Sequence, residues 1–178
     1  MCVVCVDVCS KLVALEALYD KASATITAWF FEHIICKYGK PRYVCSNCGG
    51  EFCGAFDSLL QSLAITHVTT VPYYPQSNEQ VKVMNRVAKG ALRRLMSEHP
   101  SAFWDELLPE VKLGMRCVVS SVHGFTPFEV VFKQEPILLA LSLPPLQFQD
   151  GTDVDAVVAH MCELLAIRGV KNSVVLAC

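Results

Sequence analysis

The sequence lacks the long apolar segments of a membrane protein. Although 53% of its 178 residues are hydrophobic, no run approaches the about 18 uninterrupted apolar residues of a membrane-spanning helix. Its first residues have neither the basic stretch nor the long apolar stretch of a secretory signal peptide. Internal repeats are absent as well. The length corresponds to about one domain, and we expect a soluble, intracellular protein with no membrane partner.

The chain also has little net charge. Its 15 basic and 17 acidic side chains give a formal charge of −2, which argues against a protein that binds nucleic acid through its bulk charge. Any nucleic-acid site must therefore be a local basic patch. A chain of this length buries roughly 70% of the surface that its unfolded form exposes, so its core does not require disulfides or a structural metal.

Cysteine, in contrast, is abundant, with 10 residues. In a reducing compartment these are expected to be thiols, so metal binding is the structural use to consider. Two pairs have zinc-ligand spacing, Cys2 with Cys5 and Cys45 with Cys48. The first pair lies on a predicted strand, where residues three apart point to opposite faces. The second pair has no accompanying histidine pair, so we predict no metal site, with a zinc site at Cys45 and Cys48 as the alternative.

The hydrophobic pattern alternates between strands and helices. Asp20 or Ser23 is expected to cap the first helix, which Gly39 and Pro41 end, and Pro109 requires a kink or a restart in a later helix. This order indicates a mixed α/β domain with helices packed on a central sheet. The pattern predicts strands at residues 3–6, 12–17, 42–45 and 65–71, and helices at 24–35, 56–63, 79–99, 103–119 and 128–132.

Six segments carry a resemblance to a known family. They are residues 3–11, Cys-Lys-Tyr-Gly-Lys-Pro at 36–41, Ser-Asn-Cys-Gly-Gly-Glu-Phe at 46–52, Tyr-Tyr-Pro-Gln-Ser-Asn-Glu-Gln-Val at 73–81, Met-Asn-Arg at 84–86 and Gly-Phe-Thr-Pro-Phe-Glu at 124–129. In this order they resemble the integrase catalytic core of long-terminal-repeat retrotransposons of the Ty3/gypsy type and of retroviruses. The resemblance implies a ribonuclease-H-like mixed sheet flanked by helices, and a family activity that cuts and joins DNA.

The resemblance also implies a division of the chain. Residues 1–136 would form an integrase-core-like domain that is incomplete at its N-terminus. Residues 137–152 would be a proline-containing connector, and residues 153–178 a C-terminal helix and tail. A functional member of the family would act in the nucleus.

Two carboxylates of the family's catalytic site are replaced in this chain. The family holds two Mg²⁺ ions, about 3.5–4 Å apart, with three carboxylates. Its second aspartate, in a Ser-Asp-x-Gly turn, matches Asn47, and its glutamate, on the long helix, matches Lys82. A neutral amide is a weak Mg²⁺ ligand, and a lysine places a cation where the site must gather cations. We therefore predict an inactive chain with no metal and no cofactor of its own, Mg²⁺ being implied for the family only.

The first family aspartate is expected on a strand that would precede residues 3–6. The sheet is therefore predicted to lack its first strand, which would leave backbone donors and acceptors of the neighbouring strand unpaired. Asp7 matches an acidic position on the second strand and is interpreted as a strand-end residue. The alternative alignment makes Asp7 itself the first catalytic carboxylate.

The remaining functional candidate is one face of the predicted helix at 79–99. Its basic residues are spaced 4, 3 and 4 apart and so share one helix face, here called the basic face: Lys82, Arg86, Lys89 and Arg93. In the family the matching helix lies against DNA, so the resemblance implies DNA as a partner, and it also implies a possible homodimer. The alternative is an ordinary solvated surface, which Arg94 would extend.

The departures from the family follow a pattern. Family Asp, Glu, His, Gly and Arg residues correspond to Asn47, Lys82, Tyr74, Glu79 and Cys48. Each change can arise from one C-to-T or G-to-A transition, which suggests a decayed copy of a transposable element. Three interpretations stay open: an inactive pseudoenzyme that binds nucleic acid, a translated relic with no selected role, and an active polynucleotidyl transferase, which the replaced carboxylates disfavour.

Overall fold

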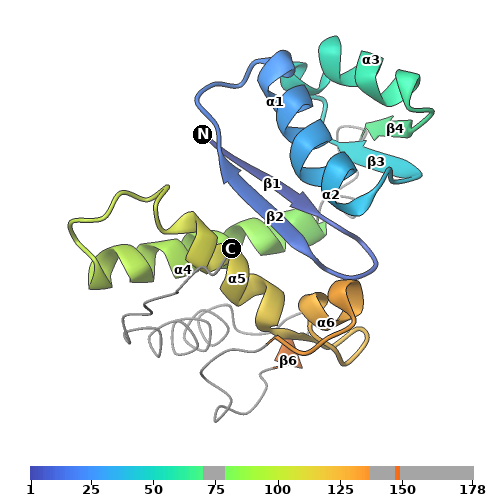
Figure 1. Ribbon diagram of the computed structural model, residues 1–178. Coiled ribbons are helices and arrows are strands. Elements are labelled where there is room, and N and C mark those ends of the chain that lie inside the picture. The colour runs from blue at the N-terminus through green and yellow to red at the C-terminus, as the bar shows by residue number, and fades with distance from the viewer. Residues whose placement is uncertain (70–78, 137–146, 149–178) are drawn as a thin grey trace, which may run out of the picture. The chain divides into compact units, whose positions relative to one another are not determined.

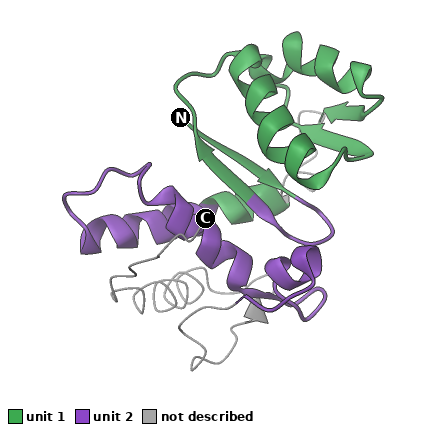
Figure 2. Ribbon diagram, viewed as in Figure 1, with its two compact units in different colours: residues 1–6, 14–85 green, residues 7–13, 86–178 purple. Residues whose placement is uncertain are grey.

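The computed structural model describes residues 1–69, 79–136 and 147–148. The predicted loop at 72–78, the end of the strand at 65–71, and the predicted C-terminal helix and tail at 153–178 lie outside these residues. None of the helices in the described ranges is both long and apolar enough to cross a membrane. The chain divides into two compact units (Figure 2). Unit 1 takes Met1–Val6 and Ala14–Asn85, and unit 2 takes Asp7–Val13 and the chain from Arg86 onward.

The chain begins with the two adjoining strands that the sequence predicts. β1 (Cys2–Val6) pairs with β2 (Val13–Ala17) in a two-stranded sheet. The Asp7 carboxylate closes the connecting turn, because its Oδ2 accepts hydrogen bonds from the Ser10 backbone N–H at 2.8 Å and from the Ser10 hydroxyl at 2.6 Å. Lys11 completes the turn with a left-handed φ of 61°. Asp7 therefore follows β1 as a strand-end residue whose carboxylate is engaged in the hairpin turn.

The first predicted helix is present and is longer than its apolar pattern. α1 (Ser23–Phe30) continues through a π-helical segment (Phe31–Ile35) into α2 (Cys36–Tyr38). It ends at Gly39, whose φ of 85° is a conformation that glycine adopts readily. The predicted stop at Gly39 is confirmed, and α2 carries the helix beyond the apolar run at 24–35.

The start of α1 differs from the prediction, because Ala22 occupies the N-cap position. Asp20 acts nearby, since its Oδ1 accepts a hydrogen bond from the Ala22 N–H at 3.0 Å. Hydrogen bonds from the Thr25 side chain and then from Ala22 hold the pKa of Asp20 below its ordinary value. The Ser23 hydroxyl does not cap the helix but accepts a hydrogen bond from the Phe56 N–H at 3.2 Å. It therefore ties α1 to α3.

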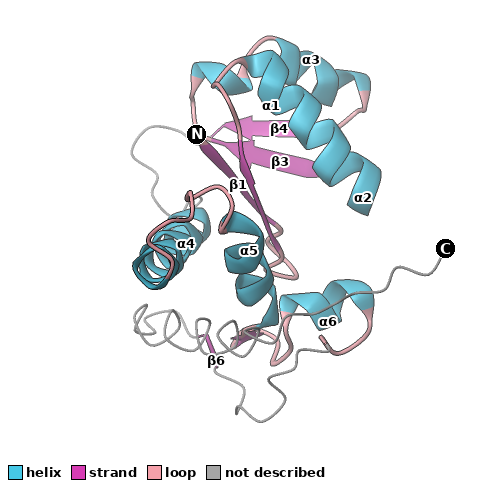
Figure 3. Cartoon of the chain, turned by 60° about the vertical axis from the view of Figure 1, so that its left-hand side comes forward, coloured by secondary structure: helices cyan, strands magenta, loops and turns pink. Residues whose placement is uncertain are grey.

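A parallel strand pair follows (Figures 1 and 3). β3 (Tyr43–Ser46) pairs with β4 (Thr66–Thr69), with Ser46 opposite Thr69 at the end of the ladder. Between the two strands run a short 3₁₀ helix (Gly50–Phe52) and α3 (Ala55–Ser62), as a parallel connection requires. This strand–helix–strand order confirms the sequence prediction for residues 42–69.

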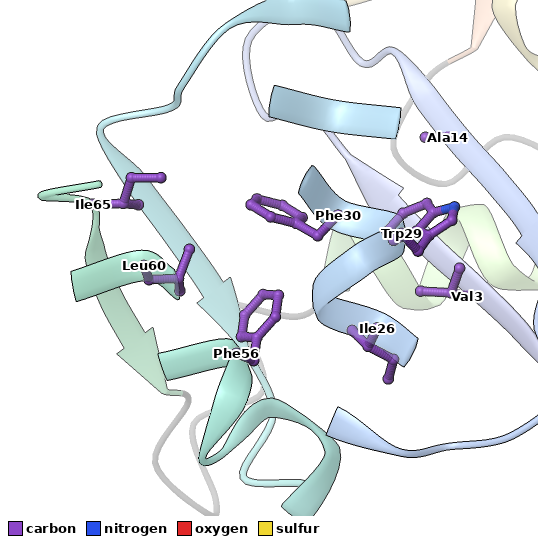
Figure 4. Packing of buried hydrophobic residues seen from close by; sticks show 8 residues of the cluster. All are labelled: Val3, Ala14, Ile26, Trp29, Phe30, Phe56, Leu60 and Ile65. Carbon is purple, nitrogen blue, oxygen red and sulfur yellow. The ribbon is translucent and has the colours of Figure 1, made fainter. Parts of the chain in front are cut away.

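One hydrophobic cluster joins the elements of unit 1 (Figure 4). Phe56 is its centre, with ring contacts to Phe30 at 5.3 Å, to Phe52 at 5.4 Å and to His67 at 5.7 Å between centroids. The cluster draws buried residues from β1, β2, α1, α3 and the residue before β4, namely Val3, Ala14, Ile26, Trp29, Phe30, Phe56, Leu60 and Ile65. The sheets β1–β2 and β3–β4 thus pack on common helices, although in the described part of the chain they do not pair with each other.

The described residues of unit 2 include three helical segments. α4 (Glu79–Glu98) begins in unit 1 and carries the chain into unit 2, where α5 (Leu108–Cys117) and α6 (Pro127–Phe132) follow. The predicted helix at 103–119 was too long at both ends. It begins only at Leu108, because Pro109 has no N–H and is tolerated in the first helical turn.

The described part of unit 2 also contains two short strands, a capping box and a hydrogen bond from α5 to Val13. β5 (Val119–Ser120) pairs in parallel with β6 (Gln147–Phe148), which lies inside the predicted connector at 137–152. Thr126 and Glu129 form a capping box at the start of α6, with Glu129 N–H donating to the Thr126 hydroxyl at 3.1 Å. Arg116 on α5 donates from Nε to the Val13 carbonyl at 3.0 Å and so ties the helix to the hairpin turn region.

Candidate nucleic-acid interface and carboxylate positions

The basic face lies on α4, the longest helix of the described residues. All four of its side chains are exposed: Lys82, Arg86, Lys89 and Arg93. Because a helix turns by about 100° per residue, these four positions lie within an arc of about 60°. The opposite face of the helix is buried, with Val87 2%, Ala91 0% and Leu95 2% exposed. The helix therefore separates an apolar side from a basic side, as the sequence pattern predicts.

Arg94 does not extend the basic face. It lies about 100° around the helix from Arg93, and its Nε donates to the Glu98 carboxylate at 3.2 Å. This intrahelical ion pair neutralises its charge locally. The basic face consequently consists of four cations in a row along about three helical turns. Such a row can contact successive phosphates of a DNA backbone.

Asn47, which the resemblance matches to a family aspartate, follows β3 directly and is exposed. Its side-chain Oδ1 accepts a hydrogen bond from the Gly49 N–H at 3.2 Å, and its main-chain carbonyl accepts one from the Ser46 hydroxyl at 2.9 Å. A Cβ at Gly49 would lie 2.5 Å from the Glu51 carboxylate, so this carboxylate lies against the turn. A neutral amide thus stands at the end of β3, in a turn that its own side chain helps to close.

Lys82, which the resemblance matches to the family glutamate, lies in the first turns of α4, and both it and Asn47 belong to unit 1. The structure gives Lys82 a cationic, exposed side chain on the basic face. Among the residues whose placement is described, no group of three or more His, Cys, Asp or Glu side chains could hold a metal ion. Cys45 and Cys48, the alternative zinc ligands, are both exposed.

One constellation was missed by the sequence analysis. Ser46, at the end of β3, lies within hydrogen-bonding distance of His67 on β4, with 2.8 Å between Oγ and Nε2. The other ring nitrogen of His67, Nδ1, lies 2.5 Å from the Asp57 carboxylate on α3. These residues are far apart in the sequence and share no motif spacing. The sequence showed only that His67 lies on a predicted strand. That this strand runs parallel to the one before Asn47, and so brings His67 to Ser46, is known from the structure.

Curated proteins similar to this chain are transposon polyproteins of fission yeast. The Tf2-3 and Tf2-4 polyproteins of Schizosaccharomyces pombe are each 28% identical to it over 152 residues. The match covers 84% of this chain but 11% of each polyprotein, so the chain spans only a small part of these relatives. No protein-family model matches the chain.

Solved structures with the same fold are retroviral integrases. A simian T-cell lymphotropic virus intasome in complex with a PP2A regulatory subunit matches with a TM-score of 0.66 and 24% identity, over 85% of this chain and 52% of that one. The HTLV-2 integrase catalytic core domain in complex with magnesium, in its trimeric form, matches with a TM-score of 0.60 and 23% identity, over 72% and 82%. The BIV integrase core matches with a TM-score of 0.62 and 22% identity, over 74% and 85%.

These likenesses confirm the ribonuclease-H-like, mixed α/β fold that the sequence predicts. The turn after β3 and the long helix α4, which carry the two positions matched in the resemblance, are part of this shared fold. Over 84% of its length the chain is similar to a segment of the Tf2 polyproteins, and its fold is similar to that of the retroviral integrase catalytic cores.

Proposed function

We propose that this integrase-core-like domain binds DNA through the basic face of α4 and does not catalyse strand transfer. The observation that carries the proposal is the separation of the helix into an exposed row of four cations and a buried apolar side. Lys and Arg neutralise phosphates and release counterions, which supplies affinity without sequence recognition. Because the net charge of the chain is −2, this local row has to supply the attraction.

Binding is expected to weaken steeply with salt. Four phosphate contacts give a slope of about −3.6 in a plot of log affinity against log salt concentration, at about −0.9 per contact. Changing Lys82, Arg86, Lys89 and Arg93 together to alanine should bring the slope close to zero, and alanine keeps the helix intact. The measurement is fluorescence anisotropy of a short labelled duplex with the purified chain across a salt series.

The control variant removes the same number of positive charges from positions outside α4. A second variant changes four exposed basic residues outside α4 to alanine: Lys21, Lys37, Arg42 and Lys133. It has the same net charge as the first variant and should keep the wild-type slope. Equal loss in both variants would refute a local interface. A folded wild-type chain that binds no DNA would support the alternative function, a translated relic of a decayed element.

We also propose that the chain is a pseudoenzyme whose sheet lacks one strand. Asn47 and Lys82 support the loss of catalysis, because neither side chain replaces a carboxylate as a Mg²⁺ ligand. The two sheets of unit 1 support the missing strand, since β1–β2 and β3–β4 share one core cluster and do not pair with each other in the described residues. In the resembling family, a strand with the first catalytic aspartate lies inside this sheet.

Restoring two carboxylates is therefore expected to leave the chain inactive. The double variant Asn47→Asp, Lys82→Glu should show no Mg²⁺-dependent joining of a labelled DNA end above background, because two of three ligands cannot hold both metal ions. A retroviral integrase serves as the active control, and circular dichroism verifies that the variant folds. Joining by the double variant would overturn the proposed missing strand and would return Asp7 to consideration as a ligand.

We further propose that this chain associates with itself and acts in the nucleus. The HTLV-2 core domain has been solved in a trimeric form and in a dimeric form, and we propose that this chain likewise forms a homodimer. A domain that binds DNA in this way would act in the nucleus. Sedimentation of the purified chain at several concentrations tests the homodimer, and a single monomeric species at all of them would contradict it.

A further inference from the structure

The three residues Ser46, His67 and Asp57 form a continuous chain of hydrogen bonds, here called the relay. It joins three elements of unit 1, namely β3, β4 and α3. Ser46 is 7% exposed, and the side chains of His67 and Asp57 are 12% and 39% exposed. The His67 ring packs edge-on against Phe56 at 5.7 Å, so an aromatic core side chain holds it in place. A buried polar network of this kind is stabilising only when every member has a partner.

The acceptor groups around Ser46 indicate where the protons of the Ser46 hydroxyl and the His67 ring lie. The Ser46 hydroxyl lies 2.9 Å from the main-chain carbonyl of Asn47, which can only accept, so the single hydroxyl proton of Ser46 points to that carbonyl. His67 must then donate from Nε2 to the Ser46 oxygen. The other ring nitrogen of His67, Nδ1, lies 2.5 Å from the Asp57 carboxylate.

This arrangement differs from that of a serine nucleophile. In a Ser-His-Asp hydrolase the serine donates to an unprotonated Nε2, which then takes its proton. Here the Ser46 hydroxyl donates instead to the main-chain carbonyl of Asn47. The relay therefore ends on the peptide unit of Asn47 and not on an open substrate site.

We propose that Asp57, His67 and Ser46 are positioning residues that hold the main chain of residue 47 in place at the end of β3. This inference deepens the proposed function and rests on the assignment of residue 47 to a carboxylate position. The relay thus still positions the main chain at residue 47, although the side chain there is an amide and not a carboxylate. The relay acts through hydrogen bonds from three elements, so losing any one member releases the turn.

The test uses nuclear magnetic resonance on the full, ¹⁵N-labelled chain. Ser46→Ala removes the last donor of the relay, and Ser46→Thr keeps a hydroxyl at the same position. In Ser46→Ala the order parameter of the Asn47 amide should fall from about 0.85 to below about 0.6, the values of rigid and flexible backbone. Ser46→Thr should restore it. The amide of Leu18, which donates to the Met1 carbonyl in the hairpin of the same unit, should keep its value in both variants.

The ring nitrogens of His67 give an independent readout. The relay predicts a proton on Nε2, visible as a one-bond nitrogen–proton coupling in the wild-type chain. An unprotonated Nε2, or labelling of Ser46 by a fluorophosphonate, would overturn the proposal in favour of a nucleophilic serine. An unchanged Asn47 order parameter in Ser46→Ala, or an equal fall at Leu18, would also overturn it. None of these outcomes depends on DNA binding, so failure of the relay and failure of the proposed function are distinguishable.

Discussion

The variant Phe56→Ala is expected to lose about 3–5 kcal/mol of the free energy of unfolding. Phe56 is 2% exposed and contacts the rings of Phe30, Phe52 and His67. Truncation removes these contacts and leaves a cavity between α1 and α3 that rigid helices can fill only in part. Since a domain is stable by only about 5–15 kcal/mol, a loss of this size brings unit 1 close to unfolding at room temperature.

Urea denaturation followed by tryptophan fluorescence measures this loss. The chain has 2 tryptophans, and in a Trp104→Phe background the remaining Trp29, which is 6% exposed, reports on unit 1. The control is Phe31→Ala, the same truncation at a side chain that is 44% exposed, and it should cost less than about 1 kcal/mol. Similar losses in the two variants would contradict the position of Phe56 at the centre of the cluster.

The variant Val111→Asp is expected to have an effect as large in unit 2. Val111 is on α5 and is 0% exposed, among other buried side chains such as Leu108 and Met115. A carboxylate there would be taken out of water with no cation provided for it, which costs several kcal/mol even if it is protonated instead. We expect a loss of at least about 3 kcal/mol, enough to leave α5 without stable packing.

The same substitution at an exposed position provides the comparison. Val122 lies in unit 2 and is 68% exposed, so Val122→Asp should change the free energy of unfolding by less than about 0.5 kcal/mol. Trp104, in a Trp29→Phe background, reports on unit 2 in the same urea experiment. If Val111→Asp were as stable as Val122→Asp, α5 could not pack as the structure shows.

The helices and strands could be predicted where the pattern was local. α4 and α1 follow from apolar residues at helical spacing, and the stop at Gly39 follows from a φ that other residues adopt rarely. The predicted helix at 103–119 began too early because its apolar pattern continues across Pro109, while the fold uses that proline in the first turn of α5. Capping was also misjudged, since the Ser23 hydroxyl is used between elements.

In the candidate site, too, local features could be predicted from the sequence and contacts between distant residues could not. The basic face could be predicted, because residues spaced by three and four share a side of any helix. The side chains that support residue 47 could not be predicted. His67 and Asp57 lie 10 residues apart on a strand and a helix, and only the packing of α3 on β4 brings their side chains together.

The sequence by itself determined the order of the elements, the basic face of α4, and the amide and lysine that the resemblance matches to two family carboxylates. These properties depend on residue identity and on spacing along one element, which the chain carries before it folds. The tertiary structure alone decided that the strand pairs β1–β2 and β3–β4 share a core without pairing with each other in the described residues. It also decided that the side chains of Ser46, His67 and Asp57 meet beside Asn47. Contacts of this kind join residues distant in sequence, so they exist only after the elements have packed.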